Sequence, residues 1–306
     1  MRIVYIGNFE PRHSTENHLA STLEMLGHEV VREQENKRTA EQVAVDAKGA
    51  DFLMWTRTWG IEGNARAMLA GLDCPSVAYH LDLYAGLNRG LRIKDEPWWG
   101  CSLVCTADGG SEEYWQARGI NHFWFPPGVY EPECYLAEPG PTKHDVIFVG
   151  SKPYHSEWPW RPQLIEWLHD TYGHRFAHYG NGSPVSCIRN EELNTLYASS
   201  KVVVGDSLCL NYTHPRYWSD RIPETLGRGG FLLHPKVPGL EGHYIDGEHL
   251  ATFDYGDLAG LKQQIDYYLR ADREREEIRA AGHAHVKASH TYTQRMQALI
   301  ELVNDA

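Results

Sequence analysis

Two side chains in the second half of the chain have types and a spacing suited to binding a nucleotide. Arg221 and Glu224 stand three residues apart in a stretch with a helical pattern, so both are expected on one face of a helix. A carboxylate can accept hydrogen bonds from two ribose hydroxyls, and a guanidinium can bind a phosphate with two N–H groups. The pair indicates a nucleotide site, and an ion pair between Glu224 and Arg228 is the structural alternative.

A second candidate group follows the apolar run that opens the second half of the chain. Gly150 and Ser151 are small enough for a phosphate to approach the backbone, and Lys152 adds a positive charge. This group predicts a phosphate-binding turn, and a solvated lysine on a tight turn is the alternative. Gly180 and Asp206 also follow apolar runs, so each is expected at a strand end, although Gly180 could equally belong to an ordinary turn.

These segments resemble the sugar-nucleotide half of GT-B glycosyltransferases, in particular the spore-maturation-type members. Those members read Ser-x-Arg-x-x-Glu followed by Gly-Gly-Phe or Gly-Gly-Leu. The matching positions in this chain are Ser219, Arg221, Glu224, Gly229, Gly230 and Phe231. The run from 148 to 152, the loop from 179 to 182 and the stretch from 191 to 207 also resemble family segments.

The resemblance implies an α/β protein of the GT-B fold, with two Rossmann-like doubly wound parallel-sheet lobes and a cleft between them. It implies transfer of a sugar from a nucleoside-diphosphate donor, expected to be a UDP-sugar, to an acceptor hydroxyl, with no further cofactor. The residues expected to bind the donor are Gly150, Ser151, Lys152, Gly180, Asp206, Ser219, Arg221 and Glu224. Retaining members carry another glutamate eight residues before Glu224, where this chain has Arg216, so the donor sugar and the stereochemistry are left open.

In the first half of the chain, the run from Pro75 to Asp82 resembles the strand-end His-Asp signature of the same enzymes. The family histidine would fall at Leu81, and a shift of one residue in a strand turns a side chain to the other face. We therefore expect Asp82, ahead of His80, to be the catalytic residue. Asp82 would be a general base in an inverting reaction and would position the acceptor in a retaining one. Capping of the next helix is its structural alternative.

The acceptor is expected to be a glycan or, as for some phage-encoded relatives, a hydroxylated DNA base. The cationic run from 89 to 94, Trp158 and Trp160 would suit DNA, because access to a base needs phosphate contacts and a stacking side chain. The net charge of −12 disfavours a protein that holds DNA through a broad basic surface. A sugar-nucleotide epimerase and a noncatalytic nucleotide-sugar-binding protein are the alternative functions.

Apolar runs alternate with helical patterns along the whole chain of 306 residues, a length typical of two domains with parallel sheets. The predicted strands are 3–6, 29–31, 51–55, 76–79, 102–106, 122–125, 145–149, 175–179, 201–205 and 230–233. We predict a first lobe at 1–130, a proline-rich linker at 126–143 and a second lobe at 144–290. A C-terminal helix at 291–306 is expected to cross back to the first lobe.

Composition and missing motifs exclude several classes of protein. No apolar stretch approaches the ~20 residues of a membrane span, and the start of the chain lacks the apolar core of a secretory signal. Free thiols in the cytoplasm are expected, because no Cys-x-x-Cys pair occurs among Cys74, Cys101, Cys105, Cys134, Cys187 and Cys209. No metal-ligand spacing is present, so metal-independent transfer is expected. The absence of Gly-x-Gly-x-x-Gly after the first strand disfavours a dehydrogenase.

Overall fold

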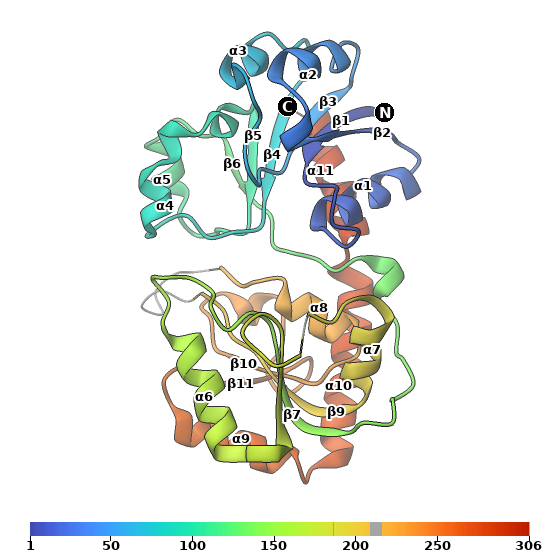
Figure 1. Cartoon of the computed structure of the whole chain (residues 1–306), viewed down its shortest axis with the longest axis vertical. Helices are drawn as coiled ribbons and strands as arrows, with labels where there is room; N and C mark the ends of the chain where they lie inside the picture. The colour runs from blue at the N-terminus through green and yellow to red at the C-terminus, as the bar shows by residue number, and fades with distance from the viewer. Residues whose placement is uncertain (186, 209–215, 306) are drawn as a thin grey trace. The chain divides into compact units, whose positions relative to one another are not determined.

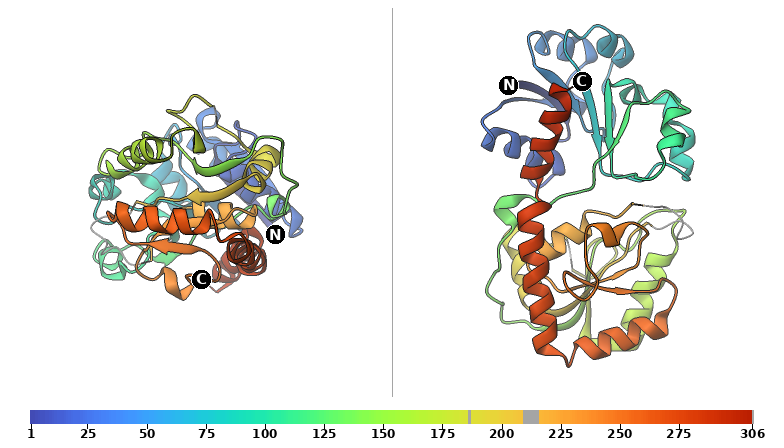
Figure 2. Two further views of the ribbon diagram at one scale, coloured as in Figure 1. Left: turned by 90° about the horizontal axis from the view of Figure 1, so that it is seen from below. Right: turned by 180° about the vertical axis from the view of Figure 1, so that it is seen from behind.

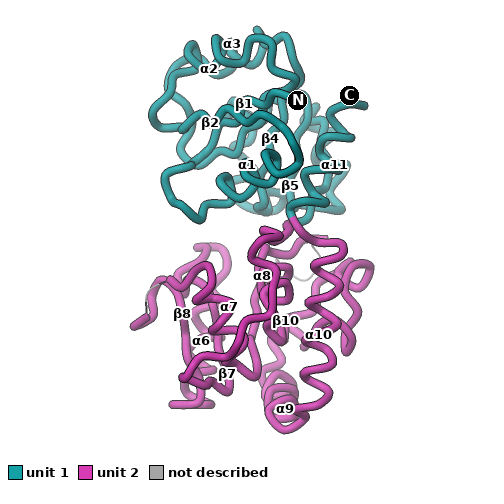
Figure 3. The backbone as a smooth tube through the Cα atoms, turned by 90° about the vertical axis from the view of Figure 1, so that its right-hand side faces the viewer, with its two compact units in different colours: residues 1–126, 292–306 teal, residues 127–291 magenta. Residues whose placement is uncertain are grey.

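The computed structural model describes residues 1–185, 187–208 and 216–305. The chain divides into two compact units (Figure 3): unit 1 comprises Met1–Pro126 and Tyr292–Ala306, and unit 2 comprises Pro127–Thr291. The segment expected as a linker, 126–143, therefore belongs almost entirely to unit 2. The reason is visible at Asn194, whose side-chain N–H groups donate to the carbonyls of Glu133 and Tyr135 at 2.9 Å each.

A parallel sheet of six strands forms the centre of unit 1 (Figure 1), in the order β2-β1-β3-β4-β5-β6. The strands are β1 (Arg2–Gly7), β2 (Glu29–Gln34), β3 (Phe52–Trp55), β4 (Ser76–His80), β5 (Leu103–Thr106) and β6 (His122–Trp124). The α-helices are α1 (Thr15–Met25), α2 (Ala40–Asp46), α3 (Ala65–Ala70), α4 (Asn88–Leu91), α5 (Glu112–Gln116) and α11 (Tyr292–Asn304). All six predicted strands of this unit are present.

Unit 2 has a parallel sheet of five strands in the order β11-β10-β9-β7-β8. The strands are β7 (His144–Val149), β8 (Phe176–Tyr179), β9 (Ser200–Val204), β10 (Leu232–Pro235) and β11 (Ala251–Phe253). The helices are α6 (Trp160–Tyr172), α7 (Asn190–Ala198), α8 (Arg221–Gly227), α9 (Leu258–Tyr268) and α10 (Asp272–Ser289). The predicted strand at 230–233 begins two residues later, and the three-residue β11 was not predicted.

The strands are buried because helices pack against the sheets. Ile3, Val4 and Ile6 of β1 have no exposed surface, which is typical of a parallel strand inside a doubly wound sheet. On α1, Leu19 and Leu23 are fully buried and four residues apart, so they form one apolar stripe. The fold thus follows from the two periodicities that the sequence displays.

The final helix, α11, belongs to unit 1, where it packs against α1. Met296 and Leu299 are fully buried, and the Nε of Arg295 donates to the carbonyl of Pro126 at 2.8 Å. Figure 2 shows α10 as a long helix along one side of unit 2. The apolar face read from the sequence thus has its partner in the first strand-helix unit.

Each sheet has one place where the order of strands reverses. In unit 2 the chain passes from β7 outward to β8 and then returns to β9 on the other side of β7. In unit 1 the same reversal lies between β1 and β3. Ligands of open α/β sheets bind at the carboxyl ends of strands at such positions.

Among the described residues, no helix has the length and apolar character needed to cross a membrane. The cysteines in the described ranges are free thiols, and Cys209 lies outside those ranges.

Candidate functional site

The candidate donor site of unit 2 is built around the turn that follows β7. Gly150 has φ +144°, a backbone conformation that favours glycine, and its N–H donates to the carbonyl of Tyr179 at 2.8 Å. A Cβ at this position would lie 2.5 Å from a terminal nitrogen of Arg221. Gly180, with φ +139°, is packed in turn against the carbonyl of Gly150. Two glycines are therefore needed to bring the backbone against the guanidinium.

Arg221 is the first residue of α8, and its side chain packs over the ring of Phe148 with 5.0 Å between the guanidinium carbon and the ring centre. Within the described residues, its buried Nε has no hydrogen-bond acceptor. Burial, reinforced by the charge of Arg161, lowers the pKa of Arg221 from its ordinary value. Within the described residues, the site therefore holds a guanidinium whose Nε–H is left without an acceptor, although the charges of Asp220 and Asp206 act on it.

Two further buried polar atoms lie beside Arg221. The Oγ of Ser219 and the Nε2 of His234 have no hydrogen-bond partner in the part of the chain that the structure describes. The Nδ1 of His234 bonds the carbonyl of Pro235 at 2.8 Å, and burial lowers the pKa of His234 to about 3. The imidazole is therefore neutral, with Nδ1–H as the donor and Nε2 as the acceptor. Ser219 thus lies in the predicted site, and His234 was not predicted from the sequence.

Asp206, a predicted donor-binding residue, is paired within unit 2. Its side chain is fully buried, and Oδ2 accepts a hydrogen bond from the Nε of Arg161 at 2.8 Å. The indole Nε1 of Trp158 lies 3.3 Å from the same oxygen. Burial raises the pKa of Asp206, and the charge of Arg161 opposes that rise. Asp206 therefore supports the site by fixing Arg161 and Trp158.

Glu224 forms the ion pair that was the alternative to ribose binding. Its Oε2 lies 2.8 Å from the Nε of Arg228, four residues later on α8. Arg228 also pairs with Glu133 and donates to Asn194 Oδ1 at 2.7 Å. The second oxygen of Glu224 takes no part in these contacts, so the ion pair leaves one acceptor for a ligand.

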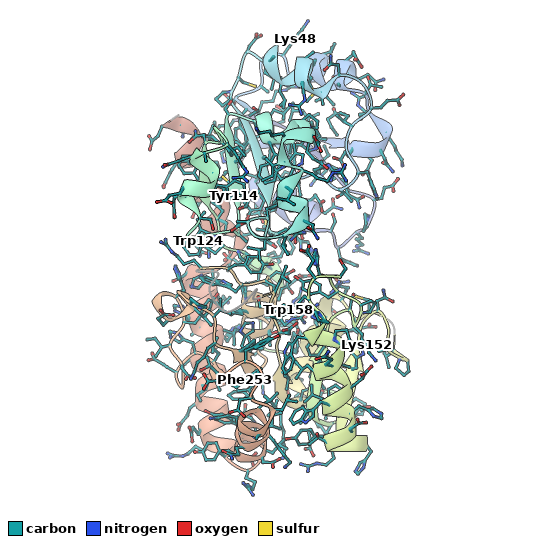
Figure 4. The ribbon with its side chains drawn as sticks, turned by 90° about the vertical axis from the view of Figure 1, so that its left-hand side faces the viewer. Lys48, Tyr114, Trp124, Lys152, Trp158 and Phe253 are labelled. Carbon is teal, nitrogen blue, oxygen red and sulfur yellow. The ribbon has the colours of Figure 1, made fainter. Side chains whose placement is uncertain are left out.

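Lys152 and Ser151 follow Gly150 directly and are partly exposed. The backbone N–H of Lys152 donates to the carbonyl of Asn181 at 2.8 Å, which ties the turn to the loop after β8. Its Nζ lies 2.8 Å from Glu166 Oε1 of α6, beside which Figure 4 shows it. Lys152 thus lies at the predicted turn, where its ammonium group pairs with the surface carboxylate of Glu166.

In unit 1, the structure brings together both predicted catalytic residues at the end of β4. Oδ2 of Asp82 lies 3.3 Å from Nδ1 of His80 and 3.2 Å from a terminal nitrogen of Arg89. The Nε2 of His80 contacts the carbonyl of Arg57 at 3.1 Å, and its ring stacks on Trp98. Asp82 is 39% exposed, so its carboxylate is both oriented by neighbours and open to solvent.

Of the cationic run at 89–94, Arg89 is half-buried, whereas Arg92 and Lys94 are exposed. Arg89 belongs to α4 and pairs with Asp82, and Arg92 lies 3.5 Å from Asp95. Trp158 contacts Asp206, and both Trp158 and Trp160 pack against Tyr255. These tryptophans therefore pack within unit 2. Arg216, which stands in place of the family glutamate, is exposed with φ +54°.

Two buried carboxylates of unit 1 were not predicted from the sequence. Glu35 accepts from the indole of Trp55 at 2.9 Å and from the N–H of Trp59 at 2.7 Å. Asp108 accepts from the N–H groups of Tyr84 and Ala85 at 2.8 and 2.7 Å. No local motif marks either of them, because their donors come from distant segments. Among the described residues, no group of three or more His, Cys, Asp or Glu side chains could hold a metal ion.

Comparison with known proteins gives one family match and several structures of similar fold. Residues 161–301 match the family model described as "Glycosyl transferase-like". No match was found among curated protein sequences.

Several solved structures resemble the whole chain at low sequence identity. An alpha-glucosyltransferase in complex with UDP and a 13-mer DNA containing an HMU base has a TM-score of 0.73 and 11% identity, with 99% of each chain covered. HepE of Anabaena in complex with UDP-glucose has a TM-score of 0.70 and 13% identity, with 100% of each chain covered. A glycosyltransferase from Rickettsia africae has a TM-score of 0.67 and 12% identity, covering 99% of this chain and 98% of that one. The chain therefore has the GT-B fold of these glycosyltransferases, and its residues 161–301 match the glycosyl transferase-like family.

Proposed function

We propose that this protein is a glycosyltransferase that moves a sugar from a UDP-sugar to an acceptor hydroxyl without a bound metal ion. The observation that carries the proposal is Arg221, a buried guanidinium that lies against the backbone of Gly150 at the strand-order reversal of unit 2 and whose Nε has no acceptor among the described residues. The family match to residues 161–301 and the UDP-bound structures with this fold support the same reading.

The charges around Arg221 favour a diphosphate. Arg161 is close enough to lower the pKa of Arg221, and the buried carboxylate of Asp206 forms its ion pair with Arg161 while its charge also acts on Arg221. A diphosphate would supply the missing negative charge and accept from the unpaired Nε of Arg221. As the bond from the sugar C1 to the diphosphate oxygen breaks, negative charge grows on that oxygen, and a fixed guanidinium stabilises it. Arg221 would thus stabilise the charge of the leaving diphosphate, as a divalent cation does in other transferases.

The ribose would contact Glu224 and the turn at Gly180. The free oxygen of Glu224 can accept from a ribose hydroxyl while Oε2 remains paired with Arg228. The pair orients the carboxylate, so the ion pair and the ribose contact are compatible. Ser151, Lys152 and Ser219 complete the proposed donor site.

Asp82 of unit 1 would serve the acceptor. His80 and Arg89 contact only its Oδ2, which leaves Oδ1 to accept the proton of an acceptor hydroxyl. In an inverting reaction that hydroxyl oxygen then bonds to C1, the C1–O bond to UDP breaks, and the proton stays on Asp82. In a retaining reaction the leaving phosphate oxygen takes the proton, and Asp82 positions the acceptor.

The test is donor turnover with and without acceptors, in the presence of EDTA. UDP-glucose, UDP-galactose and UDP-N-acetylglucosamine would each be incubated with oligosaccharides and with DNA containing hydroxymethylated bases. A glycosyltransferase releases UDP slowly by hydrolysis and faster when its acceptor is present. Conversion of the UDP-sugar to an isomer without acceptor would identify an epimerase instead, and binding without any product would identify a noncatalytic binding protein.

A further inference from the structure

A pocket lies at the end of the unit 2 sheet opposite the candidate donor site, at the amino ends of β7 and β9. It has a volume of about 370 Å³, within the range of small-molecule sites. His144 and Gly150 flank the two ends of β7, so the pocket is about 20 Å from the candidate donor site at a rise of ~3.3 Å per residue. The two sites are therefore separate.

The pocket is strongly basic, although the chain carries a net charge of −12. The lysines and arginines that line it are Lys143, Arg175, Lys201, Arg275 and Arg279. Only two carboxylates, Asp145 and Glu276, share the lining. Such a local reversal of charge attracts anions.

Arg275 is a buried hydrogen-bond donor among the residues that line the pocket. It is 5% exposed, and its terminal nitrogen donates to the carbonyl of Tyr268 at 2.7 Å. Its Nε lies 3.4 Å from Glu276 Oε1 but, among the described residues, has no hydrogen-bond acceptor. Leaving a buried guanidinium N–H unpaired is costly unless a ligand or water accepts from it.

Two of the other cations are not neutralised by the fold. Lys143 and Lys201 form no ion pair with any residue that the structure describes, whereas Arg175 is paired with Asp145 at 2.6 Å. Arg279 lies one turn after Arg275 on α10 and donates to Glu276 Oε2 at 3.0 Å. Asp272, whose Oδ1 lies 2.7 Å from a terminal nitrogen of Arg275, adds a third carboxylate beside the pocket, so its cations still outnumber the carboxylates.

We propose that this pocket binds the phosphate or diphosphate group of a small molecule. Lys143 and Lys201 would supply positive charge, and the Nε of Arg275 would donate to a phosphate oxygen. The site does not depend on the proposed transferase activity, because it shares no residue with the candidate donor site.

Inorganic pyrophosphate is the probe that tests the proposal, by isothermal titration calorimetry on the full chain. The double variant Lys143→Gln/Lys201→Gln should weaken its binding at least tenfold, and the thermal midpoint should hold because neither lysine is paired. Glu276→Gln should tighten binding severalfold, because it removes a carboxylate that competes with the anion. Lys48→Gln, at an exposed lysine of unit 1, is the matched control and should change nothing.

Arg221→Gln separates this pocket from the donor site, since pyrophosphate could also bind at Arg221. Pyrophosphate binding that falls only in Arg221→Gln, or that is equal in all variants, would overturn the proposal. Retained binding in Arg221→Gln together with a tenfold loss in the lysine double variant would support it.

Discussion

The strand ends of unit 1 and unit 2 carry opposite kinds of charged group. In unit 2, Arg161 and Arg221 share the single buried carboxylate of Asp206, and the Nε of Arg221 has no acceptor among the described residues. In unit 1, Glu35 is satisfied by backbone and indole N–H groups, and Asp82 is oriented by His80 and Arg89. Similar parallel sheets thus present a positive site in one unit and carboxylates in the other.

This difference suits the two units to two steps of group transfer, diphosphate binding in unit 2 and acceptor binding in unit 1. A cation that the fold leaves unpaired is suited to a diphosphate, because the ligand completes its electrostatics. A carboxylate with one oriented and one open oxygen is suited to a hydroxyl, because it can accept a proton or a hydrogen bond. The comparison therefore separates donor binding from turnover, and substitutions in each unit should affect different quantities.

Asp82→Asn in unit 1 should have the largest effect, and it should fall on turnover. We expect kcat to fall by about 10²–10⁴-fold if Asp82 is the general base, because an amide cannot take up the proton. Affinity for UDP should stay unchanged, since the proposed site for UDP lies in unit 2. Steady-state kinetics and UDP titration measure the two quantities. Asp95→Asn, at an exposed carboxylate, is the control, and a loss of UDP affinity in Asp82→Asn would break the division between units.

Gly150→Ala in unit 2 should weaken UDP binding by about tenfold or more. The new Cβ would push against the guanidinium of Arg221, and the positive φ would add ~1–3 kcal/mol of strain. Gly247→Ala is the matched control, because Gly247 has φ +77° and nothing lies within 4 Å of its added Cβ. Equal UDP affinity in both alanine variants would show that the contact with Arg221 does not shape the site.

Glu224→Gln should weaken UDP binding by about fivefold, the effect of losing one hydrogen bond of ~1 kcal/mol. Glu133→Gln is a sharp control because Glu133 is the other carboxylate that pairs with Arg228. Both variants disturb that ion-pair network and should lower the thermal midpoint to a similar degree. Only Glu224→Gln should lower UDP affinity, so the same affinity in both variants would assign Glu224 a structural role alone.

The smallest effect concerns acid stability. Burial lowers the pKa of His234 to about 3 in unit 2 and that of His122 to about 4 in unit 1. Because the unfolded chain takes up these protons near pH 6.5 and the folded chain does not, stability is lost as the pH falls below about 6.5. Each histidine contributes a slope of up to about 1.4 kcal/mol per pH unit. His234→Gln should make the thermal midpoint fall less steeply between pH 6.5 and 4.5, and an unchanged slope would contradict the assignment.

Much of the fold could be predicted from the sequence because the long elements carry clear periodic patterns. Residues 3–6 form a continuous apolar run, and Leu19 and Leu23 mark one face of a helix, so β1 and α1 are where they were expected. β11 and α4 have three and four residues, too few to display a period. Their places are decided by the sheet and by the segments packed on them.

The site was harder to predict than the fold because its pairings are between distant residues. Asp206 follows a strand and so resembles a ligand-binding carboxylate, yet Arg161, on α6, occupies it. Glu35 likewise receives its donors from Trp55, Thr58 and Trp59. Arg221 and Gly150 could be named as candidates because each has a local signal, an arginine at a helix start and a glycine at a strand end, and the structure brings the two into contact.

The most direct test of the division between units is UDP titration of Arg221→Gln beside Asp82→Asn. The account predicts that Arg221→Gln weakens UDP binding by about 10- to 100-fold, because hydrogen bonds to a charged group contribute ~1.5–3 kcal/mol. It predicts that Asp82→Asn and the exposed control Arg273→Gln bind UDP as the unmodified protein does. Equal UDP affinity in all three variants, or a loss confined to Asp82→Asn, would contradict the donor site proposed for unit 2.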